Sequence, residues 1–293
     1  MATLRQIVRR IRSIQSTAKT TRAMSLVAGS KMRRAQQMAL SHRPYAEELR
    51  TLLSNVVGGL QDAGLEELAQ AHPLLARREV KTPGLVLVTP DRGLCGGLNT
   101  SIIRVAGAYV ASHPGLKMVA VGRKGADFFA KTRTEIIGSF TRLGDYPSYD
   151  DTRPISRLVI DAYTSGEVDS VAIAFPHFVN TLSQRPEVIE LLPVAAPKGA
   201  AGKQVDYIYE PDAATVLAAL LPRFVEIQVY RAILETAASF QSAQMVAMRA
   251  ATDAANDMIS ELTLLRNKVR QEQITKELLD ITGGVEAMAA AGA

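Results

Sequence analysis

The segment DRGLCGGLN, at 91–99, has residue types that could bind phosphate. An acid, an arginine and three glycines follow an apolar run there, which is where nucleotide-binding proteins hold phosphate. The spacing is not GxGxxG, and no lysine followed by serine or threonine is present for a P-loop. The next apolar run ends in Gly122, Arg123 and Lys124, without the acid that would hold a ribose hydroxyl. We therefore interpret Gly93, Gly96 and Gly97 as turn residues that allow close packing, with Asp91 and Arg92 at a strand end. A nucleotide-binding enzyme is a third and less favoured hypothesis.

Other catalytic patterns are missing from the sequence. Its four histidines are scattered, and neither HExxH nor GxSxG occurs. The single cysteine, Cys95, excludes an internal disulfide and a cysteine-built zinc site, and it fits a reducing compartment. We therefore expect no catalytic residue, no metal ligands, no cofactor and no small-molecule substrate of its own.

The C-terminal part of the chain carries a seven-residue repeat of apolar and small residues. The run extends from about Asp212 to about Ile281. Within it no proline follows Pro222 and no glycine occurs between Pro222 and Gly283, so the repeat there predicts one uninterrupted helix. Such a helix, about 60 residues and roughly 90 Å long, extends beyond any single globular core and needs a partner helix. One seam runs through Leu220, Ile227, Leu234, Met248, Ala255, Leu262 and Val269, and a second through Phe224, Ala238, Met245 and Ile259.

The N-terminal part supplies that partner, because it carries a matching pair of heptad seams. Pro44 should bend this helix near Arg43, and Gly58 and Gly59 should end it. The two terminal helices are therefore predicted to form a long antiparallel coiled coil. The N-terminal seams run through Leu4, Ile11, Ala18, Ser25, Met32, Ala39, Ala46 and Leu53, and through Ile7, Ile14, Thr21, Ala28, Ala35, His42, Leu49 and Val56.

Between these helices the pattern changes to short apolar runs that alternate with helical segments. Strands are expected at 84–90, 117–122, 133–140, 170–179 and 188–194, and helices at 101–113, 125–132 and 155–166. This alternation predicts a Rossmann-like α/β domain with a mainly parallel sheet. The predicted division is an N-terminal helix at 1–58, a connection at 59–82, the α/β domain at 83–203 and the C-terminal helix with its lead-in at 204–293.

The charge and hydropathy of the N-terminal segment restrict the functions that the chain can have. The 293 residues carry a formal net charge of +5, and no acid occurs between Arg5 and Arg43. That basic face fits solvent, an acidic protein surface, a phosphate backbone or anionic lipid. A basic coiled-coil RNA-binding protein is therefore an alternative function, although the aromatic residues that would stack on bases make up only 5% of the chain. The arginine-rich start has no continuous apolar core, so we expect neither a signal peptide nor a membrane span.

Four segments together resemble the gamma subunits of F-type ATP synthases, and the likeness covers nearly the whole chain. They are RIRSIQSTAKTTRAMSLVAGSKMRRAQ near the start, DRGLCGGLN, YIYEPD, and the run from QMVAMRAATDAAND to ITGG near the end. The resemblance implies a non-catalytic central-stalk rotor that couples ion flow through a ring of c subunits to ATP synthesis or hydrolysis on beta subunits. The implied partners are the alpha and beta subunits, the epsilon subunit and the c-ring, with no nucleic acid. The implied place is the cytoplasmic side of a bacterial inner membrane, as a peripheral protein.

The resemblance also implies contact residues. Gln271 and Thr275 match positions that contact beta, Met24 matches a position beside the same region, and Gln244 stands where the family usually has arginine. That substitution leaves a neutral hydrogen bond in place of a charged one. Residues that match the ring-facing positions are Tyr207, Tyr209 and Glu210.

Overall fold

The computed structural model describes residues 3–59, 72–194, 210 and 213–291. These fall into two compact units, one made of Met1–Val27 with Ala247–Ala293 and the other of Ala28–Val246. The boundaries cut both long helices, α1 (Leu4–Gly59) and α6 (Ala213–Ala291), so each helix contributes to both units. The four-part division expected from the sequence stays a prediction.

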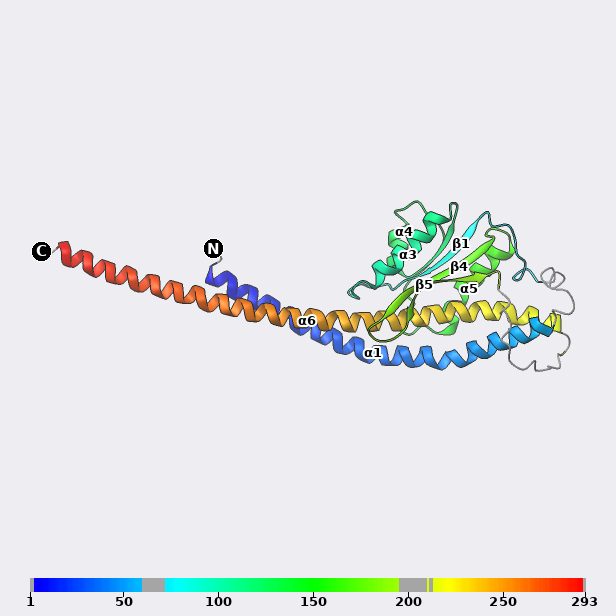
Figure 1. The fold of residues 1–293 in the computed structure, drawn as a ribbon, viewed down its shortest axis with the longest axis horizontal. Helices are drawn as coiled ribbons and strands as arrows, with labels where there is room; N and C mark the ends of the chain where they lie inside the picture. Colours follow the sequence, from blue (N-terminus) through cyan, green and yellow to red (C-terminus); the bar gives the residue numbers. More distant parts are fainter. Residues whose placement is uncertain (1–2, 60–71, 195–209, 211–212, 292–293) are drawn as a thin grey trace. The chain divides into compact units, whose positions relative to one another are not determined.

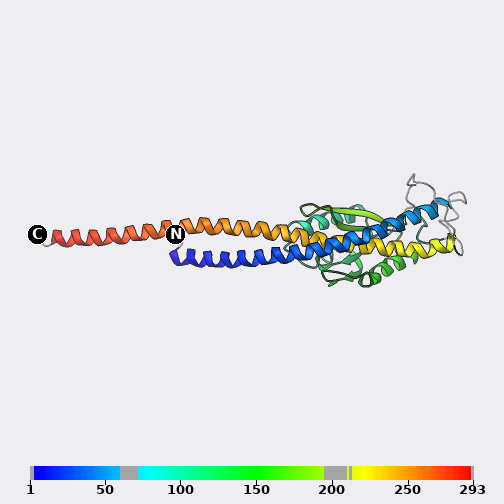
Figure 2. The same ribbon diagram turned by 90° about the horizontal axis from the view of Figure 1, so that it is seen from below.

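The smaller unit is a pair of helical segments. The first part of α1 lies beside α6 in both views (Figures 1 and 2). Ile7, Ile11 and Ala18 of the predicted seams are buried there. The hydroxyls of Thr21 and Thr252 are 2.7 Å apart and hydrogen bonded. The heptad pattern therefore buries its apolar face through helix pairing, as the sequence predicts.

The larger unit shows the direction of the pairing. Gly29 lies close to the sulfur of Met245, Ala35 packs with Ala238, and Leu49 packs with Ile227. Because the partner numbers fall on α6 as they rise along α1, the two helices are antiparallel. The predicted antiparallel coiled coil is therefore confirmed.

The sheet of the larger unit has five strands in the order β3-β2-β1-β4-β5. All pairings are parallel except that between β4 and β5. The strand β1 is buried along its whole length, which suits its continuous apolar sequence and its central place. The strands are β1 (Pro83–Val88), β2 (Lys117–Val121), β3 (Glu135–Phe140), β4 (Ser170–Phe178) and β5 (Gln184–Leu192).

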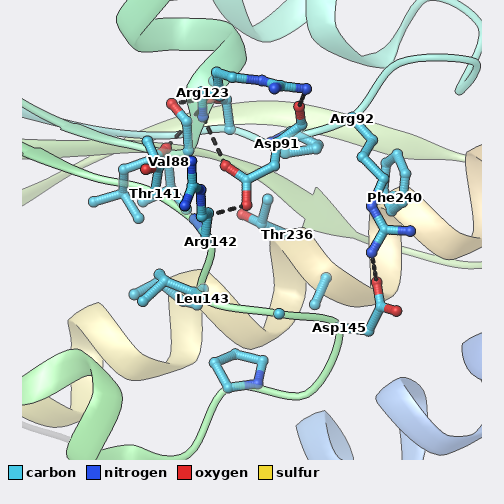
Figure 3. Close-up of a pocket in the computed structure, with 18 of the residues that line it drawn as sticks. Val88, Asp91, Arg92, Arg123, Thr141, Arg142, Leu143, Asp145, Thr236 and Phe240 are labelled. Atoms are coloured by element: carbon cyan, nitrogen blue, oxygen red, sulfur yellow. Dashed lines mark hydrogen bonds and ion pairs between the residues drawn. The ribbon is translucent and has the colours of Figure 1, made fainter.

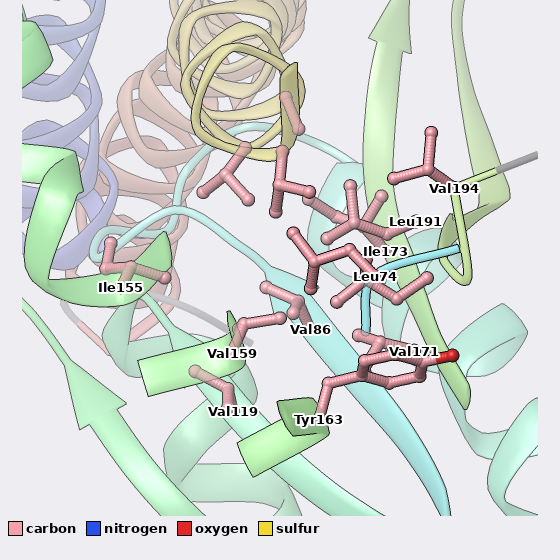
Figure 4. Packing of buried hydrophobic residues seen from close by; sticks show 14 of the residues in the cluster. Leu74, Val86, Val119, Ile155, Val159, Tyr163, Val171, Ile173, Leu191 and Val194 are labelled. Carbon is pink, nitrogen blue, oxygen red and sulfur yellow. The ribbon is translucent and has the colours of Figure 1, made fainter. Parts of the chain in front are cut away.

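Helices cover both faces of this sheet. On one face α3 (Leu98–Ser112) and α4 (Arg123–Phe129) pack on Leu85, Leu87 and Met118. On the other, α5 (Tyr149–Thr164) and the first part of α6 pack on Val86, Ile173 and their neighbours (Figure 4). A parallel sheet with helices on both faces is the predicted Rossmann-like arrangement, which is confirmed.

Several predicted boundaries were wrong, three of them by four residues or more. The helix α6 continues through Gly283 and Gly284 to Ala291, because glycine costs a helix only about 1 kcal/mol and good helix formers follow. The helix α5 begins at Tyr149, six residues before the predicted start, because Ser148 and Asp151 form a capping box. The strand β5 begins at Gln184, since it pairs with β4 through Phe178 and Gln184.

None of the described helices carries an apolar stretch long enough to cross a bilayer.

Candidate functional site

The DRGLCGGLN segment follows β1 at the carboxyl edge of the sheet, and its first acid organises that edge. The Asp91 carboxylate accepts a hydrogen bond from the backbone N–H of Arg123 at 2.9 Å and another from that of Arg142 at 3.0 Å. Figure 3 shows Asp91 between these two arginines. Asp91 therefore joins the start of α4 to the loop that follows β3.

Backbone donors at the start of α4 are used by the chain itself. Besides the Arg123 N–H bound to Asp91, the N–H of Gly125 donates to the Thr89 hydroxyl at 2.9 Å. These are the donors that hold phosphate in dinucleotide-binding folds. A phosphate at this edge would therefore need other partners.

Among the glycines, the one that the backbone requires most is Gly122. Its φ is 89°, and a Cβ there would lie 1.7 Å from the Thr89 carbonyl oxygen. Gly96 also has a positive φ, of 58°. A Cβ at Gly97 would meet nothing within 4 Å, so the close packing expected there was wrong. No local pattern in the sequence singles out Gly122 as the critical position.

Asp145, in the loop after β3, holds together segments that are far apart in the sequence. Its carboxylate bonds the Lys31 ammonium of α1 at 2.6 Å, the Arg92 guanidinium at 2.8 Å and the Gln241 amide of α6 at 3.1 Å. Burial alone would raise the pKa of Asp145, but the Lys31 hydrogen bond and the Arg92 charge outweigh it and lower the pKa below its usual value. We call these four residues the Asp145 cluster.

A second polar cluster joins α6 to the end of β4. Glu235 is 1% exposed, and its carboxylate meets the His177 ring nitrogen and the Nε of Arg231, the latter at 2.8 Å. A buried carboxylate is costly unless it is paired in this way. An acid inside the apolar run AILETAASF was the available sequence signal for this cluster, but not for its partners.

A third cluster lies where α5 begins. The Tyr149 hydroxyl meets the Glu226 carboxylate and the Arg223 guanidinium, and Arg223 also lies over the Tyr149 ring at 4.5 Å. Burial and the Glu226 hydrogen bond raise the pKa of Tyr149 to about 12. The face of α6 that packs on the α/β elements is thus held by polar as well as apolar contacts.

A cavity of about 530 Å³ lies beside Asp91 (Figure 3). It is bounded by the residues that follow β1, β2 and β3, and by α6 from Ile233 to Gln241. Arg92, Arg123 and Arg142 line it with Asp91, Asp127 and Asp145. No group of histidine, cysteine or acid side chains within the described residues could hold a metal ion.

The structure places the residues predicted to contact beta subunits on both long helices. Gln271 and Thr275 are exposed on α6, one turn apart on the same face, and Met24 is half-buried on α1 of the same unit. Gln244 is half-buried on the part of α6 that belongs to the larger unit. Of the predicted ring-facing residues, Glu210 is exposed, while Tyr207 and Tyr209 lie outside the described residues.

The last part of α6 also carries an apolar stripe that the seams predicted from the sequence did not include. Its members recur at spacings of four and three and are between 49% and 74% exposed. That spacing places them along one side of a helix, as in a coiled-coil seam. The stripe consists of Ile274, Leu278, Ile281, Val285 and Met288.

Comparison with known proteins identifies the family. A family model described as ATP synthase matches residues 3–288. The ATP synthase gamma chain of Dehalococcoides mccartyi strain CBDB1 is 50% identical over 290 residues, which cover 99% of this chain and 100% of that one. The chain belongs to the ATP synthase gamma chain family. The gamma chain of Desulforamulus reducens, another member, is 45% identical over 98% of this chain and 100% of its own length.

Solved structures agree on the fold. The central stalk and c-ring structure of the Tetrahymena thermophila mitochondrial ATP synthase contains a chain that matches with a TM-score of 0.59 and 23% identity, over 79% of this chain and 99% of that one. A chain of the Euglena gracilis mitochondrial ATP synthase matches with a TM-score of 0.56 and 19% identity, over 90% of this chain and 96% of that one. The family model and the gamma chain relatives confirm the family resemblance found in the sequence, and the comparisons give the RNA-binding alternative no support.

Proposed function

We propose that this chain is the central-stalk rotor subunit of a membrane-bound rotary ATP synthase. The observation that carries the proposal is membership of the gamma chain family over essentially the whole length. In this function the chain makes and breaks no bonds. It couples the turning of a c-ring, driven by ion flow, to changes at the nucleotide sites of the beta subunits.

The exposed stripe from Ile274 to Met288 supports this function. A solvated row of large apolar side chains at seam spacing is unfavourable, so it needs an apolar surface to cover it. The cavity inside a hexamer of alpha and beta subunits would supply such a surface. Gln271 and Thr275 lie where the stripe begins and would hydrogen-bond to beta, with Met24 on the paired segment of α1 and Gln244 making a neutral contact further along α6.

The rotor function also requires a contact through which the c-ring passes torque to the chain. Tyr207, Tyr209 and Glu210 precede α6 in the sequence, and we assign them to contact with the c-ring. The epsilon subunit completes the set of partners. The chain would then be a peripheral protein on the cytoplasmic side of a bacterial inner membrane, and the division at 1–58, 59–82, 83–203 and 204–293 would separate its functional parts.

Reconstitution with alpha and beta subunits tests this function. The chain should assemble with them, and the Gln271→Leu, Thr275→Val double variant should lower the rate of gradient-driven ATP synthesis or weaken assembly. Its control is Gln273→Leu, which makes the same change about 200° around the helix and should leave both unchanged. Failure of the unaltered chain to assemble would remove the rotor function, whereas unchanged synthesis in the double variant would remove only the two contacts.

A further inference from the structure

The cavity beside Asp91 is not used by the rotor function, and its place in the fold is where ligands bind. It opens at the carboxyl ends of β1, β2 and β3, and α6 closes one side of it. In open α/β sheets ligands bind at this edge, next to the point where the strand order reverses; here that point lies between β1 and β4, beside the β1 end of the cavity. Its volume, about 530 Å³, is within the range of small-molecule sites.

Two guanidinium groups at this cavity are available to an anion. Arg92 is already paired with Asp145. Arg123 donates one hydrogen bond, at 3.2 Å, to the backbone carbonyl of Asp91, which leaves most of its donors unused. The Arg142 side chain is exposed and has no hydrogen bond or ion pair to any residue that the structure describes. The nearby Asp91 carboxylate accepts hydrogen bonds from two backbone N–H groups.

The backbone at Arg142 is unusual. Its φ is 63°, in the left-handed region that favours glycine. Conformations of this kind cluster at ligand sites, where the surrounding structure holds them in place. Here the hydrogen bond from the Arg142 N–H to Asp91 holds the backbone in this conformation, and it keeps the Arg142 side chain beside the cavity.

The remaining walls offer different chemistry. Val88, Leu143, Ile233 and Phe240 form an apolar side. Asp127 lines the cavity, is exposed and forms no ion pair within the described part of the chain, so its carboxylate can accept hydrogen bonds from hydroxyl groups. The site thus combines cations for phosphate, an acceptor for hydroxyls and an apolar wall that includes an aromatic ring.

We propose that this cavity binds a mononucleotide, with its phosphates on Arg123 and Arg142, its ribose hydroxyls toward Asp127 and its base against Ile233 and Phe240. The phosphates meet side chains here, because the backbone donors at the start of α4 are taken by Asp91 and Thr89. This binding is separate from the rotor function and does not depend on it.

Equilibrium dialysis of the purified full-length chain, free of other subunits, tests the proposal. The probes are ATP, ADP, adenosine and inorganic phosphate. We expect saturable binding of one ATP or ADP per chain, weaker binding of adenosine and of phosphate alone, and about tenfold or greater weakening in Arg142→Gly, since one charged hydrogen-bond partner is lost.

The glycine variant suits this test because glycine adopts the backbone of Arg142 without strain, so it should fold at least as well. Its matched control is Arg133→Gly, since Arg133 is also an exposed arginine with a positive φ, of 59°, but does not line the cavity. Arg133→Gly should bind as the unaltered chain does. The proposal is overturned if no probe binds saturably, if Arg142→Gly binds as tightly as Arg133→Gly, or if phosphate alone binds as tightly as ATP.

Discussion

Replacing Asp145 by alanine should destabilise the larger unit more than the same replacement at any other exposed or half-exposed acid of that unit. The Asp145 side chain is only 18% exposed, and its carboxylate has three partners. Gln241 is 2% exposed, so its amide donor has little access to water after the carboxylate is removed. A buried donor left without a partner costs about 1–3 kcal/mol.

Loss of the Asp145 carboxylate costs less free energy at Lys31 and Arg92 than at Gln241. The Lys31 side chain is 33% exposed and that of Arg92 is 57% exposed, so both can be solvated after the change. Solvent-exposed ion pairs contribute at most about 1 kcal/mol each. Together these contributions predict a loss of about 1–5 kcal/mol in the free energy of unfolding for Asp145→Ala. Asp145→Asn should lose about half of that, since its amide oxygen still accepts one bond.

Urea unfolding measures this loss, followed by the near-ultraviolet circular dichroism of the tyrosines, because the chain has no tryptophan. The midpoint should fall while the slope stays the same. Asp127→Ala is the control, because Asp127 is exposed and forms no ion pair within the described residues, so it should change stability by less than about 0.5 kcal/mol. Equal losses in Asp145→Ala and Asp127→Ala would refute the role of the Asp145 cluster.

The same cluster makes a pH prediction whose sign follows from the lowered pKa. A carboxyl group with a lowered folded-state pKa contributes stability above its unfolded-state pKa and loses it as the pH falls through the folded-state value. The difference in stability between the unaltered chain and Asp145→Asn should therefore be constant at neutral pH and shrink below the usual value of 3.8. A difference that persists unchanged in acid would mean that the carboxylate charge is not what stabilises the cluster.

Two further predictions concern Gly122 and Tyr149. Gly122→Ala should prevent folding or cost several kcal/mol, because its Cβ would lie 1.7 Å from the Thr89 carbonyl oxygen. Gly144 is the control: its φ is 83° and open space surrounds it, so Gly144→Ala should cost only about 1 kcal/mol. Thermal unfolding compares the two variants, and similar midpoints would contradict the clash at Gly122. Because the pKa of Tyr149 is raised to about 12, its contribution to stability should be complete below pH 10 and fall as the pH rises toward 12. Glu226→Gln should lower that pKa in an absorbance titration of tyrosine ionisation, and an unchanged titration would exclude the Glu226 hydrogen bond as a cause.

Much of the fold could be predicted because its signals are local. Heptad spacing marks a helix wherever it occurs, and the alternation of short apolar runs with helical segments indicates the fold class. The boundaries failed where a single local feature was misjudged. Gly283 and Gly284 look like a stop, but a helix tolerates them. Ser148 and Asp151 form a capping box, a local signal that the predicted start of α5 overlooked.

The site was harder to predict because its partners are distant in the sequence. Asp91 and Arg92 were expected at a strand end, and they lie there. Nothing local connects Arg92 to Asp145, which is 53 positions away, or Gln241 to Asp145, which is 96 positions away. Which acid meets which cation is decided by tertiary packing, and heptad or strand periodicity carries no information about it.

The three polar clusters have a mechanical consequence for a rotor. Apolar packing of α6 on the sheet resists both separation and rotation of the helix about its own axis, because either would expose Leu221 and Val225, which are fully buried. Hydrogen bonds and ion pairs depend on distance and angle, so the contacts of α6 at Glu226, Glu235 and Gln241 oppose such rotation. They are spread along the segment of α6 that packs on the α/β elements. Torque that enters the α/β elements would therefore pass into α6 along this segment, and weakening all three clusters together should uncouple the two more than weakening any one of them.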